Sequence, residues 1–229
     1  AHLNAQGMLD YGRTVGRPAL RAMTFHDRAR MLKALALYLR EHRQALYELS
    51  YNSGGTFADH KIDIDGGIGT LLVYASKGRR DLPDAHVYLD GPPEQLGRTG
   101  AFVGQHICTP LQGVALHINA FNFPAWGMLE KLAPTLLAGM PAIVKPATAT
   151  SYITEACVRL IVNSGLLPSG AIQKVAGGIG SMLDHVTCQD VVTLTGSAAT
   201  ALILRGHQNI LKNSFRITAV QDSHNSSFL

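Results

Sequence analysis

Ile118-Asn119-Ala120-Phe121-Asn122-Phe123-Pro124 is the stretch on which the fold depends, because an apolar, strand-like run ends there and a helical pattern follows. Lys145-Pro146-Ala147-Thr148 and Thr195-Gly196-Ser197 stand at equivalent points further along the chain. In a parallel α/β sheet, the carboxyl ends of the strands form the edge where ligands bind. The three stretches therefore predict a single ligand site on one edge of such a sheet.

The residue types in these stretches suit a phosphorylated ligand and a carbonyl compound. An asparagine such as Asn122 can donate its amide N–H to a developing oxyanion. A lysine at a strand end, here Lys145, can reach ribose hydroxyls or a phosphate. Gly196 and Ser197 open a helix, where free backbone N–H groups can bind a pyrophosphate. Taken singly, such residues are more often a turn residue, a solvated strand end or a helix cap, so the inference depends on their joint order.

The sequence around these stretches alternates strand-like and helical patterns. Short apolar runs predict strands at 114–118, 142–145, 172–175 and 191–194. Helical periodicity predicts helices at 125–138, 152–164 and 181–186, with a last helix opening at Ser197. This alternation is typical of an α/β protein with a parallel, doubly wound sheet.

The first half of the chain has a different pattern. Apolar residues recur with helical spacing over 25–49, and a second helix is expected over 62–76, perturbed by glycines at 66, 67 and 69. The strand-like runs 86–89 and 101–104 flank Gly91-Pro92-Pro93 and suggest a two-stranded excursion. We therefore expect three parts: a helical part at 1–80, a β-hairpin arm at 81–111 and a nucleotide-binding α/β part at 112–229.

Composition excludes several classes of protein. The 229 residues carry a formal net charge of +4 without an aromatic-interleaved basic stripe, which argues against nucleic-acid binding. No apolar run approaches the length of a membrane span, and no targeting leader is recognisable. Cys108, Cys157 and Cys188 are far apart, which argues against a zinc site or a disulfide framework and favours a cytoplasmic protein. The chain begins at Ala1 without an initiator Met, so we expect a piece of a longer protein.

Together, the motifs resemble those of the aldehyde dehydrogenase superfamily. Five segments also look like one branch, which includes the dehydrogenase part of the phenylacetate-degradation bifunctional protein and a relative in aerobic benzoyl-CoA breakdown: 63–70, 104–107, 118–124, 145–150 and 195–200. This resemblance implies a Rossmann-type sheet and oxidation of a CoA-linked semialdehyde. It also implies a homodimer contact through the hairpin at 86–108 and a catalytic domain that lies beyond this chain.

The resemblance also implies where the cofactor binds. The implied cofactor residues are Ile118, Asn119, Ala120, Phe121, Lys145, Ala147, Thr148, Gly178, Gly180, Thr195, Gly196 and Ser197. The usual G-x-G-x-x-G fingerprint is absent, since the run from Gly178 ends on Leu183; the superfamily also lacks it. In NAD-preferring members, the residue three positions after the strand-end lysine is commonly a glutamate, and here it is Thr148. Loss of that carboxylate removes repulsion against a 2′-phosphate, so NADP is expected, with NAD possible. No metal is expected.

The resemblance implies a cysteine nucleophile, a glutamate general base and Asn122 as the oxyanion donor. The family nucleophile lies downstream of Leu229, and the position that matches the glutamate is Val220. Either the alignment here is offset by one or two residues, or the general base is absent. Cys157 is predicted to be a core residue, and Cys108 and Cys188 to be structural. Two hypotheses remain: a segment of an active CoA-semialdehyde dehydrogenase, or a non-catalytic dinucleotide-binding or assembly remnant. A third, an α/β domain that binds no nucleotide, is hard to reconcile with Asn122, Lys145 and Ser197 together.

Overall fold

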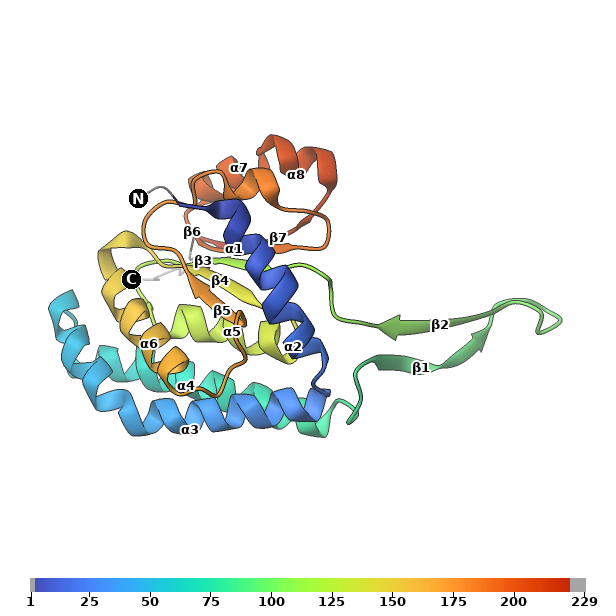
Figure 1. The fold of residues 1–229 in the computed structure, drawn as a ribbon, viewed down its shortest axis with the longest axis horizontal. Coiled ribbons are helices and arrows are strands. Elements are labelled where there is room, and N and C mark those ends of the chain that lie inside the picture. The colour runs from blue at the N-terminus through green and yellow to red at the C-terminus, as the bar shows by residue number, and fades with distance from the viewer. Residues whose placement is uncertain (1–2, 223–229) are drawn as a thin grey trace, which may run out of the picture.

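The computed structural model describes residues 3–222 and has an α/β architecture (Figure 1). Its strands form a five-stranded parallel sheet and a separate two-stranded hairpin. The strands are β1 Tyr88–Gln95, β2 Val103–Cys108, β3 Ala115–Ile118, β4 Ala142–Lys145, β5 Ile172–Lys174, β6 Val191–Gly196 and β7 Arg216–Gln221. The α-helices are α1 Ala5–Tyr11, α2 Arg17–Arg21, α3 Phe25–Ser50, α4 Phe57–Arg80, α5 Trp126–Leu137, α6 Ser151–Asn163, α7 Ala198–Arg205 and α8 Gln208–Asn213. The other helical segments are the π-helix η1 Gly12–Gly16 and the 3₁₀-helices η2 Tyr51–Ser53, η3 Thr148–Thr150 and η4 Met182–His185.

The order of the strands in the parallel sheet is β5-β4-β3-β6-β7. The chain enters at β3, moves outward through β4 to β5, and then returns to place β6 on the other side of β3. The winding direction therefore reverses between β3 and β6, which makes a topological switch point. The predicted doubly wound parallel sheet is confirmed.

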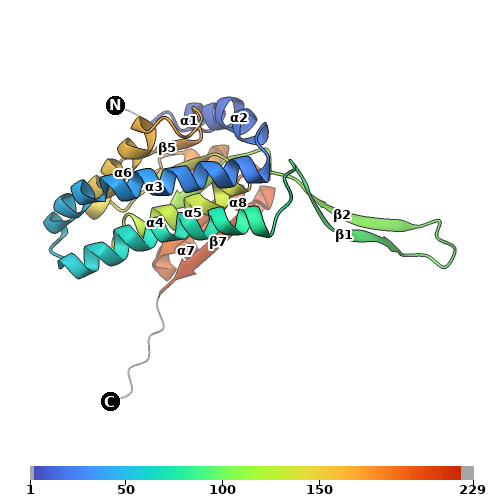
Figure 2. The ribbon, with the colours of Figure 1, turned by 90° about the horizontal axis from the view of Figure 1, so that it is seen from below.

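Two layers of helices cover the sheet (Figures 1 and 2). The long helices α3 and α4, with α5 and α6, pack on one face around a core that includes Leu35, Leu71 and Leu132. On the opposite face, α1, η4 and α7 pack against a second cluster that includes Leu116 and Leu194. The four predicted strands and the helices at 125–138 and 152–164 are confirmed within a residue or two.

Helix α4 is longer than the sequence pattern predicted, and its glycines do not interrupt it. A Cβ atom at Gly66 would lie 2.7 Å from Cε3 of Trp126, and one at Gly67 would lie 3.0 Å from Cδ1 of Leu129. Both glycines thus allow α4 to approach α5 closely. The expectation that they perturb the helix was wrong, because the gain from this packing outweighs the poor helix propensity of glycine.

The predicted two-stranded excursion is present, with strands that lie a few residues further along the chain than the predicted runs. Gly91-Pro92-Pro93 falls inside β1, where the pairing with β2 shifts register between Asp90 and Glu94. The turn is formed instead by residues 96–102, between the two strands. Proline in a strand is tolerated at such an irregularity because it cannot donate a ladder hydrogen bond. The hairpin extends away from the rest of the molecule (Figure 2).

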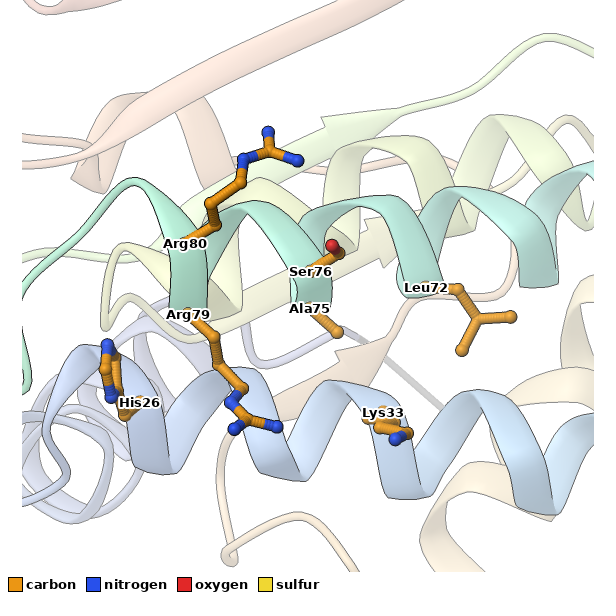
Figure 3. A pocket seen from close by; sticks show the side chains of 7 residues that line it. All are labelled: His26, Lys33, Leu72, Ala75, Ser76, Arg79 and Arg80. Atoms are coloured by element: carbon orange, nitrogen blue, oxygen red, sulfur yellow. The ribbon is translucent and has the colours of Figure 1, made fainter.

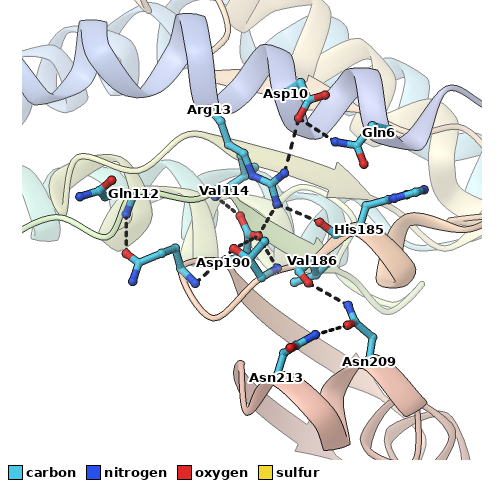
Figure 4. Close-up of polar contacts among 12 residues, drawn as sticks. Gln6, Asp10, Arg13, Gln112, Val114, His185, Val186, Asp190, Asn209 and Asn213 are labelled. Atoms are coloured by element: carbon cyan, nitrogen blue, oxygen red, sulfur yellow. Dashed lines mark hydrogen bonds and ion pairs between the residues drawn. The ribbon is translucent and has the colours of Figure 1, made fainter.

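The N-terminal segment formed by α1, η1 and α2 lies within the helical part expected at 1–80, and Asp190 joins it to the sheet (Figure 4). The buried carboxylate of Asp190 accepts hydrogen bonds from the backbone N–H groups of Val114, at 2.6 Å, and Thr187, at 2.7 Å. It also pairs with the guanidinium of Arg13, which donates to the carbonyl of His185 at 3.0 Å. Strand β7 was not predicted, and the predicted helix at 181–186 is only the short 3₁₀-helix η4.

Candidate functional site

The three motif stretches meet at the carboxyl edge of the parallel sheet. Ile118, the last residue of β3, pairs with Lys145 of β4 on one side and with Leu194 of β6 on the other. The backbone N–H of Asn119 donates to the carbonyl oxygen of Lys145 at 3.0 Å. The predicted convergence on one edge of the sheet is therefore confirmed.

The loop at 121–124 is held from two sides. The hydroxyl of Thr150 donates to the carbonyl of Phe121 at 2.9 Å, and the hydroxyl of Thr154 donates to that of Pro124 at 2.9 Å. From α4, the carboxylate of Asp63 accepts from the N–H groups of Ala125, at 3.1 Å, and Trp126, at 2.7 Å.

The side chain of Asp63, which belongs to α4, is buried and lies against the N-terminus of α5. Burial raises its pKa, and the two backbone N–H groups oppose that rise. The carboxylate satisfies N–H groups that a helix start leaves unpaired. Asp63 therefore positions the loop. The sequence did not reveal this role, because Asp63 lies far from the loop along the chain and no local sequence pattern links the two.

Asn122 lies between two cavities. The first, of about 250 Å³, is lined by Ala120, Asn122, Phe123, Trp126, Gly127, Glu130 and Thr195. The second, of about 300 Å³, separates the same loop from the end of α3 and the start of α4, and its lining includes His60 and Asp63. Among the described residues, the only ionisable side chain lining the first cavity is Glu130, whose Oε1 accepts from the ammonium of Lys131 at 3.1 Å. The exposed amide of Asn122 can therefore donate to a carbonyl oxygen held in an otherwise apolar or neutral cavity.

Several polar groups near this edge lack partners. Asn119 is 4% exposed, and neither its Oδ1 nor its Nδ2 has a hydrogen-bond partner among residues 3–222. Within the same described range, Lys145 forms no ion pair. Thr148 is exposed, and no carboxylate of this range is hydrogen-bonded to it. Buried polar atoms are normally paired, so the unpaired amide of Asn119 fits a site that receives a polar ligand.

The start of α7 departs from the prediction. Its N–H groups were expected to be free, but Ser197 Oγ accepts from the N–H of Thr200 at 3.2 Å. Both carboxylate oxygens of Asp222 lie 3.3 Å from the N–H of Ala198. A helix start attracts negative charge, and here a side chain already supplies it. An entering pyrophosphate would have to displace Asp222.

The remaining predicted cofactor residues lie at the same edge but not all in one place. Ala120 and Thr195 share the first cavity, Phe121 is 65% exposed beside it, and Ala147 precedes η3. Gly178 and Gly180 follow β5, which is separated from β6 by β4 and β3. Neither of these two glycines lines the first cavity, whereas Thr195 does.

Among residues 3–222, no cysteine thiol lies at this edge. Cys157 is completely buried, and burial raises the pKa of its thiol to about 12. Cys108 ends β2 in the hairpin, and Cys188 precedes β6, so it lies at the opposite edge of the sheet from Asn122. Val220 has no proton-accepting atom and is 65% exposed. Over the described range, no cluster of side chains could hold a metal ion, and no helix is long and apolar enough to cross a membrane.

Residues 13–219 match the aldehyde dehydrogenase family, and the chain belongs to that family. Members of this family are NAD(P)-dependent enzymes. The chain is 46% identical over 222 residues to the 3,4-dehydroadipyl-CoA semialdehyde dehydrogenase of Aromatoleum evansii, covering 96% of this chain and 43% of that protein. It is 29% identical over 184 residues to the NADP-dependent succinate-semialdehyde dehydrogenase of Escherichia coli, covering 79% of this chain and 36% of that protein. The chain thus spans less than half the length of these relatives.

Solved structures of the family have the same fold. The betaine aldehyde dehydrogenase of Staphylococcus aureus with NAD⁺ superimposes with a TM-score of 0.78 at 22% identity, over 95% of this chain and 42% of that one. The succinic semialdehyde dehydrogenase of Streptococcus pyogenes with NADP⁺ gives a TM-score of 0.70 at 20% identity, over 86% of this chain and 41% of that one. At such identities the likeness shows the fold alone, so the choice between NAD and NADP must be argued from this chain's own residues.

Proposed function

We propose that the chain is the cofactor-binding segment of an NADP-dependent dehydrogenase that oxidises a CoA-linked semialdehyde to the acid in aromatic-acid catabolism. The observation that carries the proposal is the convergence of Asn122, Lys145 and Thr195 at the carboxyl edge, beside a cavity of about 250 Å³. The 46% identity to a protein named for a CoA semialdehyde supports the substrate class.

The choice of NADP depends on Lys145 and Thr148. Lys145 ends β4 with an ammonium group that forms no ion pair within the described chain, and Thr148 stands on the following turn with a neutral hydroxyl. A phosphate near this turn meets a cation and no carboxylate, whereas a glutamate at position 148 would repel it. When bound, NADP supplies the hydride acceptor for the oxidation.

Asn122 is assigned to the reacting carbonyl. Its exposed amide borders the first cavity, where Phe123 and Trp126 provide an apolar wall. A fixed N–H donor in such surroundings stabilises negative charge that develops on oxygen. Asp63, Thr150 and Thr154 position this loop by holding its backbone.

The hairpin is proposed to contact a second copy of the chain through residues 86–108. Leu89, Phe102 and Ile107 are 51%, 65% and 58% exposed. Unpaired strand edges that carry exposed apolar residues are typical of surfaces that pair with another chain.

One observation favours the non-catalytic alternative. Val220 stands where the family resemblance places the general base, and a valine cannot accept a proton. A protein that binds the dinucleotide but does not hydrolyse an acyl-enzyme needs no general base, so a valine at this position would not impair its function.

Calorimetric titration of the 229-residue chain tests the binding part of the proposal. We expect NADP to bind more tightly than NAD, and Lys145→Gln to weaken NADP binding by roughly 10- to 100-fold, as for a charged hydrogen bond. Lys212→Gln on α8 removes the same charge far from the edge and serves as the control. An unchanged affinity for NADP in Lys145→Gln would contradict the assignment.

A further inference from the structure

A basic groove lies between α3 and α4 (Figure 3). It encloses about 380 Å³ and is lined by His26, Lys33, Leu72, Ala75, Ser76, Arg79 and Arg80. The cationic side chains come from both helices, while Leu72 and Ala75 add an apolar surface. The groove therefore combines positive charge with a small apolar floor.

The carboxylates around this groove pair with side chains other than Lys33 and Arg79. Asp81 accepts from Arg80 Nε at 2.7 Å and lies 3.6 Å from the ammonium of Lys77. Asp27 pairs with Arg30 at 2.6 Å. Asp84 accepts from the hydroxyl of Thr24, and its Oδ2 is 3.8 Å from Nδ1 of His26.

Lys33 and Arg79 differ from these groups, because neither forms an ion pair within residues 3–222. Arg79 extends from α4 toward α3, between His26 and Lys33, whereas Arg80 points to the other side of α4 (Figure 3). The groove thus contains two cations, from different helices, whose charge is not neutralised by a protein carboxylate.

Helix stabilisation explains only part of this arrangement. Lys77, Arg79 and Arg80 lie in the last turn of α4, where positive charge favours the helix dipole. Lys33 lies in the interior of α3, so the dipole of neither helix accounts for it. A ligand with more than one negative charge would account for both Lys33 and Arg79.

We propose that this groove binds the phosphate-bearing nucleotide end of CoA, with the phosphates on Lys33 and Arg79 and the adenine over Leu72 and Ala75. The inference rests on the proposed function, since only a CoA-linked substrate brings such a group to this protein in addition to the cofactor.

The path of α4 connects this groove with the loop of Asn122. Asp63, which holds the loop, and Arg79 lie on the same helix, about 24 Å apart at 1.5 Å per residue. The two ends of a CoA thioester are joined by a long, flexible pantetheine arm. One molecule could therefore place its phosphates in the groove and its aldehyde near Asn122.

Titration of the 229-residue chain with CoA under reducing conditions tests the inference. We expect Lys33→Gln and Arg79→Gln each to weaken CoA binding about tenfold. Arg40→Gln, an exposed cation further along α3, should leave it unchanged. Lys145→Gln should also leave it unchanged, because that residue belongs to the dinucleotide edge. Pantetheine should not bind, and 3′-dephospho-CoA should bind more weakly than CoA.

The outcomes separate the groove from the proposed function. Equal CoA affinity in Lys33→Gln, Arg79→Gln and Arg40→Gln would overturn the groove assignment, as would inorganic phosphate or pyrophosphate binding as tightly as CoA. If NADP binds at Lys145 while CoA does not bind, the inference fails and the dinucleotide site stands. If CoA binds in the groove and NADP does not bind at all, the cofactor assignment fails instead.

Discussion

Val220 of β7 lies directly opposite Thr195 of β6 in the parallel sheet, and Thr195 lines the same cavity as Asn122. Val220, which the family resemblance matches to the general base, is therefore paired with a residue that lines the cavity proposed for the carbonyl. The position of Val220 suits a general base, but its aliphatic side chain cannot accept a proton.

Our first prediction is that the 229-residue chain does not oxidise aldehydes by itself. It offers no thiol at the carboxyl edge, and the thiol of Cys157 has a pKa of about 12, so it stays protonated at neutral pH. The measurement is the appearance of NADPH absorbance when purified chain is mixed with NADP and a semialdehyde CoA ester. Steady NADPH formation that is abolished by substitution of Cys108, Cys157 or Cys188 would contradict this prediction.

A second prediction concerns the choice of cofactor. Thr148→Glu should reverse the preference from NADP to NAD, because a carboxylate at this position accepts from ribose hydroxyls and repels a 2′-phosphate. We expect NADP affinity to fall by at least tenfold while NAD affinity is kept or improved. Thr148→Gln, which has nearly the same size but no charge, is the matched control and should keep the preference for NADP. Identical NADP-to-NAD ratios in wild type and Thr148→Glu would rule out the argument.

A third prediction follows from His117, which is completely buried in β3 with Nε2 3.0 Å from the hydroxyl of Thr135. Burial, reinforced by the nearby charge of Lys131, lowers its pKa to about 3. The unfolded chain has a histidine pKa of about 6.5, so below that pH the unfolded state binds the extra proton. Stability must therefore fall as the pH drops from about 6.5 towards 3, by up to about 1.4 kcal/mol per pH unit from this group.

Chemical denaturation between pH 6.5 and 4.5 measures this effect. His117→Gln should reduce the slope of the unfolding free energy against pH, although it also lowers stability at neutral pH. His86→Gln removes an exposed histidine and should leave the slope as it is in the wild type. Equal slopes in all three proteins would show that His117 is not buried in its neutral form.

A fourth prediction concerns the hairpin. The isolated chain should self-associate, because β1 and β2 present unpaired edges and exposed apolar side chains. Light scattering should detect oligomers, and Phe102→Ser combined with Ile107→Ser should reduce them. Leu202→Ser on α7 removes a side chain that is 73% exposed outside the hairpin, and should have a smaller effect. A clean, stable wild-type monomer would contradict the prediction; the chain end at 226–229, also expected to promote association, lies outside the described residues.

The sequence predicted the parallel sheet well because its strands are short, apolar and separated by amphipathic helices. Asn119 directly follows β3 and Lys145 ends β4, and both were correctly placed at the carboxyl edge. Where prediction failed, long-range contacts determine the structure. Gly66 lies in a continuous α4 and packs closely against Trp126, which is far away in the sequence.

The candidate site was predictable in its residues but not in its supports. Asn122 and Thr195 follow strands that the pattern located, so their proximity could be inferred. The roles of Asp63 and Asp222 depend on which backbone N–H groups lie near them in space, which no local pattern encodes.

Hydrogen–deuterium exchange of the 229-residue chain, with and without saturating NADP, tests the central claim most directly because it locates the ligand. We expect slower exchange at 118–122, 145–148 and 195–198, with no change in α8 or the hairpin, and we expect Lys145→Gln to reduce the protection at matched ligand concentration. Protection confined to other segments, or no protection at a concentration that saturates binding, would contradict the assignment of the carboxyl edge of β3, β4 and β6 as the dinucleotide site.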